Sequence, residues 1–403
     1  MKTIKLIVLT LLLLGCKNEK GPSKNNLSSI EQGLIIIDQD YNKAIEVASL
    51  QDKLIFIDFY TTWCAPCKKL DKLIFQNDSI KQVLGKDFIL LKYNAENDSI
   101  FHLSKKHHVS SYPTGLIINK KGYVLNRKYG FPGVDFQSLN KNVLEFTNNG
   151  IELNRKNKIL KGYSNKIEVS KYPKFYVDYI DRTNTRINPL EINEYLKTEK
   201  DIFSEEYFST LIYFAKESTN DIAETILKNR DKYLTLYGKT DVEIMMYFLT
   251  SSKFDQAISE KSQSKYDAAV IYAKAGLSKK WTDDILPSFE KDFLKAQNKW
   301  DKVFEINKNL KSKGEFNNEY VNHFCWQVYE DCENQEIIKE CLKWMKVVIK
   351  EEPTYSYLDT YAYLMYKSGD KKEAKKIALL AIETAKKKEE NTESMEKLIK
   401  MIS

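Results

Sequence analysis

The feature that most constrains the fold of this chain is a pair of cysteines directly after a short apolar run. Residues 54–60 read LIFIDFY and are apolar except for Asp58, which is typical of a central strand buried on both faces. Cys64 and Cys67 follow, and the residues after them show helical spacing. Two thiols two residues apart at a helix start can close a small disulfide ring, and the helix N-terminus favours the thiolate of the first. The pattern therefore predicts a strand, a thiol-bearing turn and a helix.

Strand and helix patterns alternate on both sides of this feature. A glycine turn at residues 120–122 separates the last two apolar runs and predicts a hairpin. We therefore expect residues 29–150 to form an α/β domain with a mixed sheet flanked by helices. Further strands are expected at 34–37, 88–93, 114–119 and 123–128, and helices at 41–48, 99–106 and 134–146.

Asp58 is the one charged residue inside the apolar run. A buried carboxylate is unfavourable unless it is paired or has a chemical role, and burial raises its pKa, which would suit it to take the proton from Cys67. The alternative is a solvent-exposed strand residue. The flanking Ile57 and Phe59 favour burial.

We expect no metal site at Cys64 and Cys67, because structural zinc would need a second ligand pair. The remaining cysteines lie far away in sequence, and His102, His107 and His108 lack the spacing. His107 and His108 are expected to be surface residues at a helix end rather than proton shuttles.

Residues 34–147 resemble thioredoxin. Ala65-Pro66 departs from the Gly-Pro of typical thioredoxins, and Tyr60 stands where many have Trp, but neither change removes a reacting group. The resemblance rests on residues 58–60 (DFY), 63–67 (WCAPC) and 109–114 (VSSYPT) and on Gly130 after the hairpin.

This resemblance implies a role for each matched residue. Cys64 would be the attacking thiolate and Cys67 the resolving thiol, with Lys92 facing Asp58 from the neighbouring strand. Pro113 would be a cis proline, placing the backbone of the preceding residue where it pairs with bound substrate. No cofactor beyond the Cys64–Cys67 disulfide is implied. The expected substrate-binding residues are Trp63, Ala65, Pro66, Tyr112 and Pro113.

The first residues indicate export. A basic start precedes an apolar run at residues 6–14 that is too short to span a bilayer but fits a secretory signal. The run ends in LLGC at residues 13–16 and resembles the lipobox of bacterial lipoproteins. That resemblance implies removal of residues 1–15, lipidation of Cys16 and a tether at 16–28. The alternative is an ordinary signal peptide with an incidental cysteine.

The rest of the chain favours helices. Residues 151–187 are polar and are expected to link the first domain to an all-α domain at 188–403. Residues 319–388 resemble tetratricopeptide helical hairpins, with small residues and Gly369 at the expected spacing. Cys325, Cys332 and Cys341 lie in this part. We favour buried packing residues for all three, with a Cys325–Cys341 disulfide as the alternative.

Together these features favour a thiol–disulfide oxidoreductase of the bacterial cell envelope that reduces disulfides in client proteins. By resemblance it would be an outer-membrane lipoprotein facing the periplasm, resupplied with electrons by a membrane donor or thiol partner. The net charge of +7, from 63 basic and 56 acidic residues, indicates a solvated surface rather than a nucleic-acid partner. Two alternatives stay open, since CxxC does not encode direction. One is a disulfide oxidant or isomerase, and the other is an envelope scaffold whose helical part binds a partner.

Overall fold

The computed structural model describes residues 33–402 of the chain. The expectations for the signal peptide, the tether and Cys16 lie outside this range. Within it, no helix has both the length and the apolar character that crossing a membrane requires. The described residues form two compact units: the first comprises residues 33–104, 109–160 and 164–167, and the second comprises 105–108, 161–163 and 168–402.

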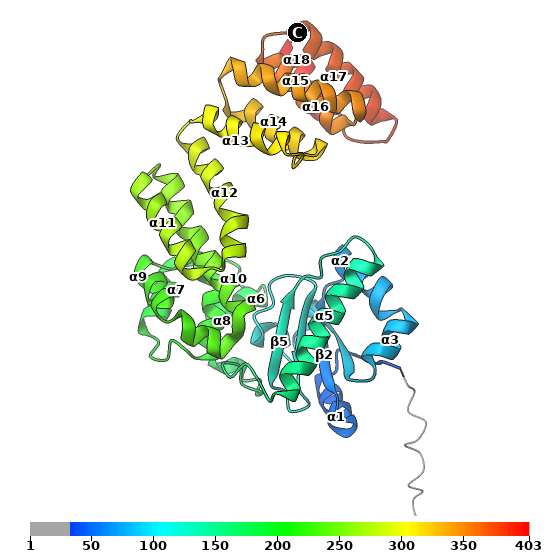
Figure 1. Cartoon of the computed structure of the whole chain (residues 1–403), viewed down its shortest axis with the longest axis vertical. Coiled ribbons are helices and arrows are strands. Elements are labelled where there is room, and N and C mark those ends of the chain that lie inside the picture. The colour runs from blue at the N-terminus through cyan, green and yellow to red at the C-terminus, as the bar shows by residue number, and fades with distance from the viewer. Residues whose placement is uncertain (1–32, 403) are drawn as a thin grey trace, which may run out of the picture. The chain divides into compact units, whose positions relative to one another are not determined.

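A five-stranded mixed sheet forms the centre of the first unit, as the sequence predicts (Figure 1). The strand order is β1-β3-β2-β4-β5; β3 pairs in parallel with both β1 and β2, and β4 pairs antiparallel with β2 and β5. The strands are β1 (Ile35–Asp38), β2 (Leu54–Tyr60), β3 (Phe88–Asn94), β4 (Thr114–Ile118) and β5 (Val124–Tyr129).

Helices flank this sheet, and α5 lies along one face of it (Figure 1). The cysteine-bearing helix α2 passes directly into a π-helical turn, η1, which the sequence pattern does not predict. The helical elements of the first unit and its borders are α1 (Tyr41–Gln51), α2 (Ala65–Leu70), η1 (Asp71–Phe75), α3 (Asp78–Leu84), η2 (Ala95–Asn97), α4 (Leu103–Lys106) and α5 (Phe136–Arg155).

Strand β2 is buried on both faces because it lies between β3 and β4 and is covered by helices. Its Phe56 is 1% exposed and meets the rings of Phe75 and Phe146 edge-on at centroid distances of 5.5 and 5.4 Å. Gly150 lets α5 approach β4, since a Cβ there would lie 2.6 Å from Ile117 Cδ1. This packing holds the end of β2, and therefore the start of α2, in a fixed place.

Helices make up the second unit, which confirms the expectation of an all-α region after the sheet domain. Two short 3₁₀ turns, η3 (Val169–Lys171) and η4 (Ala215–Glu217), accompany them. The helices are α6 (Lys174–Ile180), α7 (Pro189–Thr198), α8 (Glu205–Phe214), α9 (Asn220–Lys228), α10 (Arg230–Ser259), α11 (Gln263–Gly276), α12 (Lys279–Ala296), α13 (Trp300–Ser312), α14 (Asn318–Asp331), α15 (Gln335–Glu351), α16 (Tyr355–Lys367), α17 (Lys371–Lys386) and α18 (Glu393–Ile402).

The stretch 151–187, expected as a linker, contains regular structure. It holds the end of α5, the turn η3 and the helix α6. Tyr163 and Tyr176 within it are 1% and 0% exposed. These side chains therefore belong to a packed interior.

The last helices stack side by side (Figure 1). Ala362 of α16 and Ala378 and Ala381 of α17 are all 0% exposed, and such small residues let helices approach closely. The three cysteines of this region, Cys325, Cys332 and Cys341, are buried free thiols in the same core. This arrangement agrees with the packing role favoured for them.

Candidate active site

The cysteine pair lies where β2 leads into α2. Cys64 is the N-cap of α2, and its Sγ accepts a hydrogen bond from the backbone N–H of Cys67 at 3.1 Å. The two cysteines are joined as a disulfide with their Cα atoms 5.3 Å apart. Both are nearly buried, at 3% and 4% exposure. In the reduced protein, the same N–H and the helix N-terminus would stabilise a thiolate on Cys64.

Exposed apolar residues surround this pair. Trp63 is 62% exposed, and Ala65 and Pro66 are also exposed. The Trp63 ring meets the Tyr112 ring edge-on at 5.9 Å. The structure therefore brings together residues that lie far apart in the sequence.

The loop that follows Val109 contains a cis peptide bond between Tyr112 and Pro113. The carbonyl oxygen of Pro113 accepts a hydrogen bond from Gly130 N–H at 2.8 Å, and Thr114 Oγ1 donates to the carbonyl of Ser111 at 2.7 Å. These bonds anchor the end of the loop, where it enters β4. The ring of Tyr112 thus lies beside that of Trp63. The backbone of Pro113 is held by its hydrogen bond from Gly130.

Asp58 on β2 and Lys92 on β3 form an ion pair. Asp58 is 1% exposed, and Lys92 Nζ lies 2.6 Å from its Oδ2. Burial raises the pKa of Asp58, and the positive charge of Lys92 only partly offsets this. Asp58 Oδ1 is also buried and has no hydrogen-bond partner among the described residues. A carboxylate with a raised pKa and an open acceptor site can take up a proton during thiol chemistry.

Asp71, the first residue of η1, is a second carboxylate paired with Lys92. The sequence analysis did not identify it. Its Oδ1 lies 2.9 Å from Lys92 Nζ, and its side chain is 32% exposed. Burial alone would lower the pKa of Lys92. The carboxylates of Asp58 and Asp71 outweigh this effect and raise the pKa above its usual value. The available signal was spacing, because Asp71 lies four residues after Cys67, on the same helix face.

His107 and His108 differ from the sequence-based expectation, which placed them on the surface. They are 3% and 0% exposed, so that expectation is wrong. Both belong to the second compact unit, where the ring of Tyr163 packs against them at 6.2 and 5.8 Å. Among the described residues, no group of three or more His, Cys, Asp or Glu side chains is placed to hold a metal ion.

Comparisons with known proteins agree with this geometry. A family model described as thioredoxin-like matches residues 36–120. Thioredoxin-1 of Drosophila melanogaster is 33% identical over 100 residues, which are 25% of this chain and 83% of that protein. The thiol:disulfide interchange protein DsbD of Salmonella typhimurium is 32% identical over 110 residues, which are 27% of this chain but only 18% of DsbD.

Among solved structures, that of a proposed disulphide-isomerase from Bacteroides thetaiotaomicron shares 34% identity, covering 30% of this chain and 94% of that one with a TM-score of 0.25. The family assignment rests on the sequence matches. With the disulfide at Cys64 and Cys67 in place at the start of α2, they make this chain a member of the thioredoxin-like family and a thiol–disulfide oxidoreductase.

Proposed function

We propose that this protein works in the cell envelope as a reductant of disulfides in client proteins. The observation that carries the proposal is the set formed by the Cys64–Cys67 pair at a helix N-terminus and Asp58, a buried carboxylate of raised pKa on the strand that leads into it. Such a set supplies both a stabilised thiolate and a proton acceptor.

Reduction begins with the enzyme in its dithiol form. The Cys64 thiolate attacks one sulfur of the client disulfide, forming a mixed disulfide and releasing one client thiolate, which takes a proton from solvent. Cys67 then gives its proton to Asp58 and attacks Cys64 Sγ, which breaks the mixed disulfide and releases the second client sulfur as a thiolate that takes the proton back from Asp58. Two electrons pass to the client, and the Cys64–Cys67 disulfide remains. A thiol partner or membrane electron donor would restore the dithiol.

The client would bind over the apolar surface around the disulfide. In this proposal Trp63, Ala65 and Pro66 contact client side chains, and the backbone at Tyr112 and Pro113 pairs with the client chain as an added strand would. The exposure of Trp63, at 62%, supports this role, because a large exposed aromatic side chain favours binding.

The envelope location is supported by the sequence of residues 1–16, with its secretory pattern and terminal LLGC. We propose a lipid anchor at Cys16 in the outer membrane, with the folded units in the periplasm. The similarity to a stretch of DsbD, whose name describes thiol:disulfide interchange, supports the same chemistry.

A trapping experiment tests the proposal. In the full-length chain, Cys67→Ser should leave clients attached to Cys64 as mixed disulfides, because the resolving thiol is missing. These adducts should be visible as high-mass bands that disappear on reduction. The matched control, Cys64→Ser, should show none.

Two results would count against the proposal. Absence of adducts with Cys67→Ser in envelope preparations would contradict reduction of protein clients. Unchanged capture of a partner after replacement of both cysteines would favour a scaffold in which the helical unit does the binding.

A further inference from the structure

Four consecutive residues, 105–108, belong to the second compact unit although their sequence neighbours belong to the first. We call them the KKHH segment. They are charged or polar, yet their exposure is only 1%, 4%, 3% and 0%. Burial of such groups is unfavourable unless partners compensate for it. The partners therefore show what holds the segment.

Both lysines are paired with carboxylates of the second unit. Lys105 Nζ lies 2.5 Å from Asp181 Oδ1, and Lys106 Nζ lies 2.6 Å from Glu205 Oε1. Glu205 is itself 8% exposed, so the second pair is buried on both sides. Removing one partner of such a pair strands a buried charge.

The backbone of the segment is held as well. Tyr176 OH donates to the carbonyl of Lys105 at 2.6 Å, and Tyr172 OH donates to that of Lys106 at 3.2 Å. The two tyrosine rings stack on each other with centroids 5.1 Å apart. Aromatic hydroxyls thus satisfy two carbonyls at the end of α4.

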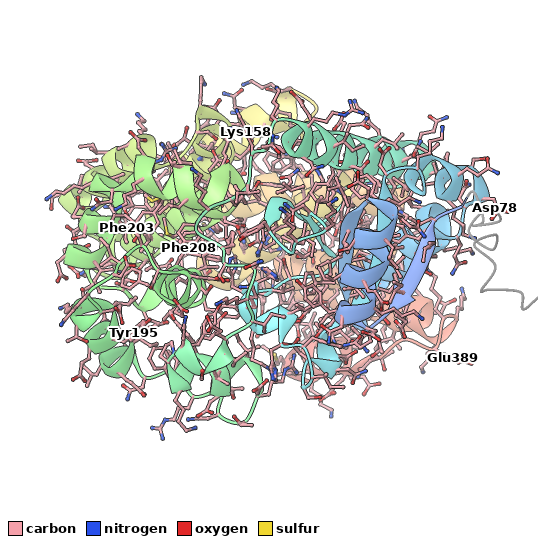
Figure 2. The ribbon with its side chains drawn as sticks, turned by 90° about the horizontal axis from the view of Figure 1, so that it is seen from below. Asp78, Lys158, Tyr195, Phe203, Phe208 and Glu389 are labelled. Carbon is pink, nitrogen blue, oxygen red and sulfur yellow. A yellow bond between two sulfur atoms is a disulfide. The ribbon has the colours of Figure 1, made fainter. Side chains whose placement is uncertain are left out.

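His108 is the most tightly enclosed member. Its Nε2 lies 2.8 Å from Tyr163 OH, which donates to Asp241 Oδ2 at 2.5 Å. Because the tyrosine proton points to Asp241, the network assigns the Nε2 proton to the bond from His108 to Tyr163. The ring of Phe208, which Figure 2 labels, packs edge-on against His108 at 5.9 Å.

The backbone of His108 ends α4 in a left-handed conformation, with φ at 38°. The N–H of His108 donates to the carbonyl of Lys105 at 3.2 Å and that of Val109 donates to the carbonyl of Ser104 at 2.9 Å, which is a common way for a helix to end. The next residue, Val109, starts the loop that reaches the cis bond before Pro113. The conformation of His108 therefore sets the direction in which this loop begins.

We propose that Tyr163 and Asp241 are positioning residues for the reaction at Cys64. By holding the side chain of His108, they add to the backbone bonds at the end of α4 and fix the start of the loop 109–113, whose backbone pairs with the client. The pairing of the loop with a client rests on the proposed function. The geometry of the loop does not depend on it. Neither residue touches the reacting sulfurs in this account.

This role predicts a selective effect. A protein client must align with the loop backbone, whereas a small disulfide needs only access to Cys64. Loosening the loop should therefore raise KM for a protein client and leave the turnover of a small disulfide unchanged. A merely structural role would not separate the two substrates.

The experiment compares two Tyr→Phe variants of the full-length chain. Tyr163→Phe removes the hydroxyl between His108 and Asp241. Tyr237→Phe is the control, since its ring lies 5.1 Å from that of Tyr163 but its hydroxyl donates to the carbonyl of Phe203, also labelled in Figure 2, at 2.8 Å. Tyr163→Phe loses the two buried hydrogen bonds of its hydroxyl, and Tyr237→Phe loses one partly buried bond in the same aromatic cluster.

We expect Tyr163→Phe to raise KM for insulin reduction about five-fold, the factor that corresponds to one hydrogen bond of ordinary strength. Its kcat with hydroxyethyl disulfide should stay the same. Amide hydrogen exchange in the peptide spanning residues 109–112 should become faster by a similar factor. Tyr237→Phe should change neither KM nor exchange in this peptide.

The inference would be overturned by an unchanged KM and unchanged exchange in Tyr163→Phe, or by equal changes in Tyr237→Phe. If Tyr163→Phe does not fold, Asp241→Asn is measured in the same way with the same expected result. If the wild-type chain fails to reduce insulin, the proposed function falls, while the exchange measurement still decides whether Tyr163 holds the loop.

Discussion

At the scale of single residues, the site depends on one lysine shared by two carboxylates. Lys92 lies 2.6 Å from buried Asp58 and 2.9 Å from the more exposed Asp71. The polarity of the strand indicates that Asp58 needs a partner, and the resemblance to thioredoxin implies that this partner is Lys92. For the second pair the sequence offers only the spacing of Asp71 from Cys67, because the orientation of Asp71 depends on the π-helical turn η1.

Replacing Asp58 should stabilise the folded protein at neutral pH. Its folded-state pKa is raised, chiefly by burial, so its contribution to stability is fully present below the ordinary Asp pKa and is lost as the pH rises through the raised value. Asp58→Asn has no carboxyl group to ionise, so the folded protein does not lose this stability as the pH rises. Denaturant titration should therefore give a higher free energy of unfolding at pH 7 for Asp58→Asn than for the wild-type chain, with Lys92 still paired to Asp71. A decrease at pH 7 would contradict this account.

The same replacement should slow catalysis, because Cys67 loses its proton acceptor. Removal of a general base typically costs about 10²- to 10⁴-fold. Stopped-flow measurement of the resolving step should show at least a ten-fold slower release of the second client thiol in Asp58→Asn. Release at the wild-type rate would exclude Asp58 as the acceptor.

Asp71→Asn should move the pH dependence rather than abolish activity. The charge of Asp71 contributes to the raised pKa of Asp58, so removing it lowers that pKa. The acid limb of the rate–pH profile for client reduction should therefore shift to lower pH. Asp78→Asn is the matched control, since Asp78, labelled in Figure 2, is 91% exposed and pairs with Lys81 on the surface. A shift to higher pH, or an equal shift in the control, would contradict the arrangement.

At the scale of elements, periodicity predicted the sheet and the helical character of the tail, because both depend on local apolar patterns. The strand at 54–60 matches β2, and the expected hairpin appears as β4 and β5. The small residues at the spacing of a helical hairpin are buried between α16 and α17. Patterns of this kind cannot show which long-range partners an element will meet, so they gave no account of η3 or α6 inside the stretch 151–187.

Close packing of α16 and α17 makes their alanines sensitive to added volume. Ala378→Leu inserts a larger side chain at a site that is 0% exposed and should lower the free energy of unfolding by about 1–3 kcal/mol. Leu379→Ala on the same helix changes a residue that is 53% exposed and should lower it by less than about 0.5 kcal/mol. Denaturant titration of both full-length variants checks this. Equal effects would argue against a tight α16–α17 contact.

At the scale of the whole molecule, sequence patterns identified the family and the reacting pair but not the division of the chain. Sequence continuity placed residues 105–108 within the first domain, whereas the structure assigns them to the second compact unit. Nothing local marks this, because lysines and histidines at a helix end are ordinarily solvated. Only their buried partners, such as Glu205 and Asp241, show where they belong. The Cys64–Cys67 disulfide was predictable because it depends on spacing along the chain.

The reduction potential of the Cys64–Cys67 pair in the full-length chain tests the central claim most directly. The chain would be equilibrated in dithiothreitol or glutathione buffers, and the fraction of disulfide measured by alkylation and mass analysis of the peptide that carries both cysteines. A value near about −270 mV, as in thioredoxin, is the predicted result for a reductant. A value near about −120 mV would contradict that direction and indicate a disulfide-forming oxidant. Failure of the pair to cycle at all would contradict the assignment of the reaction to Cys64 and Cys67.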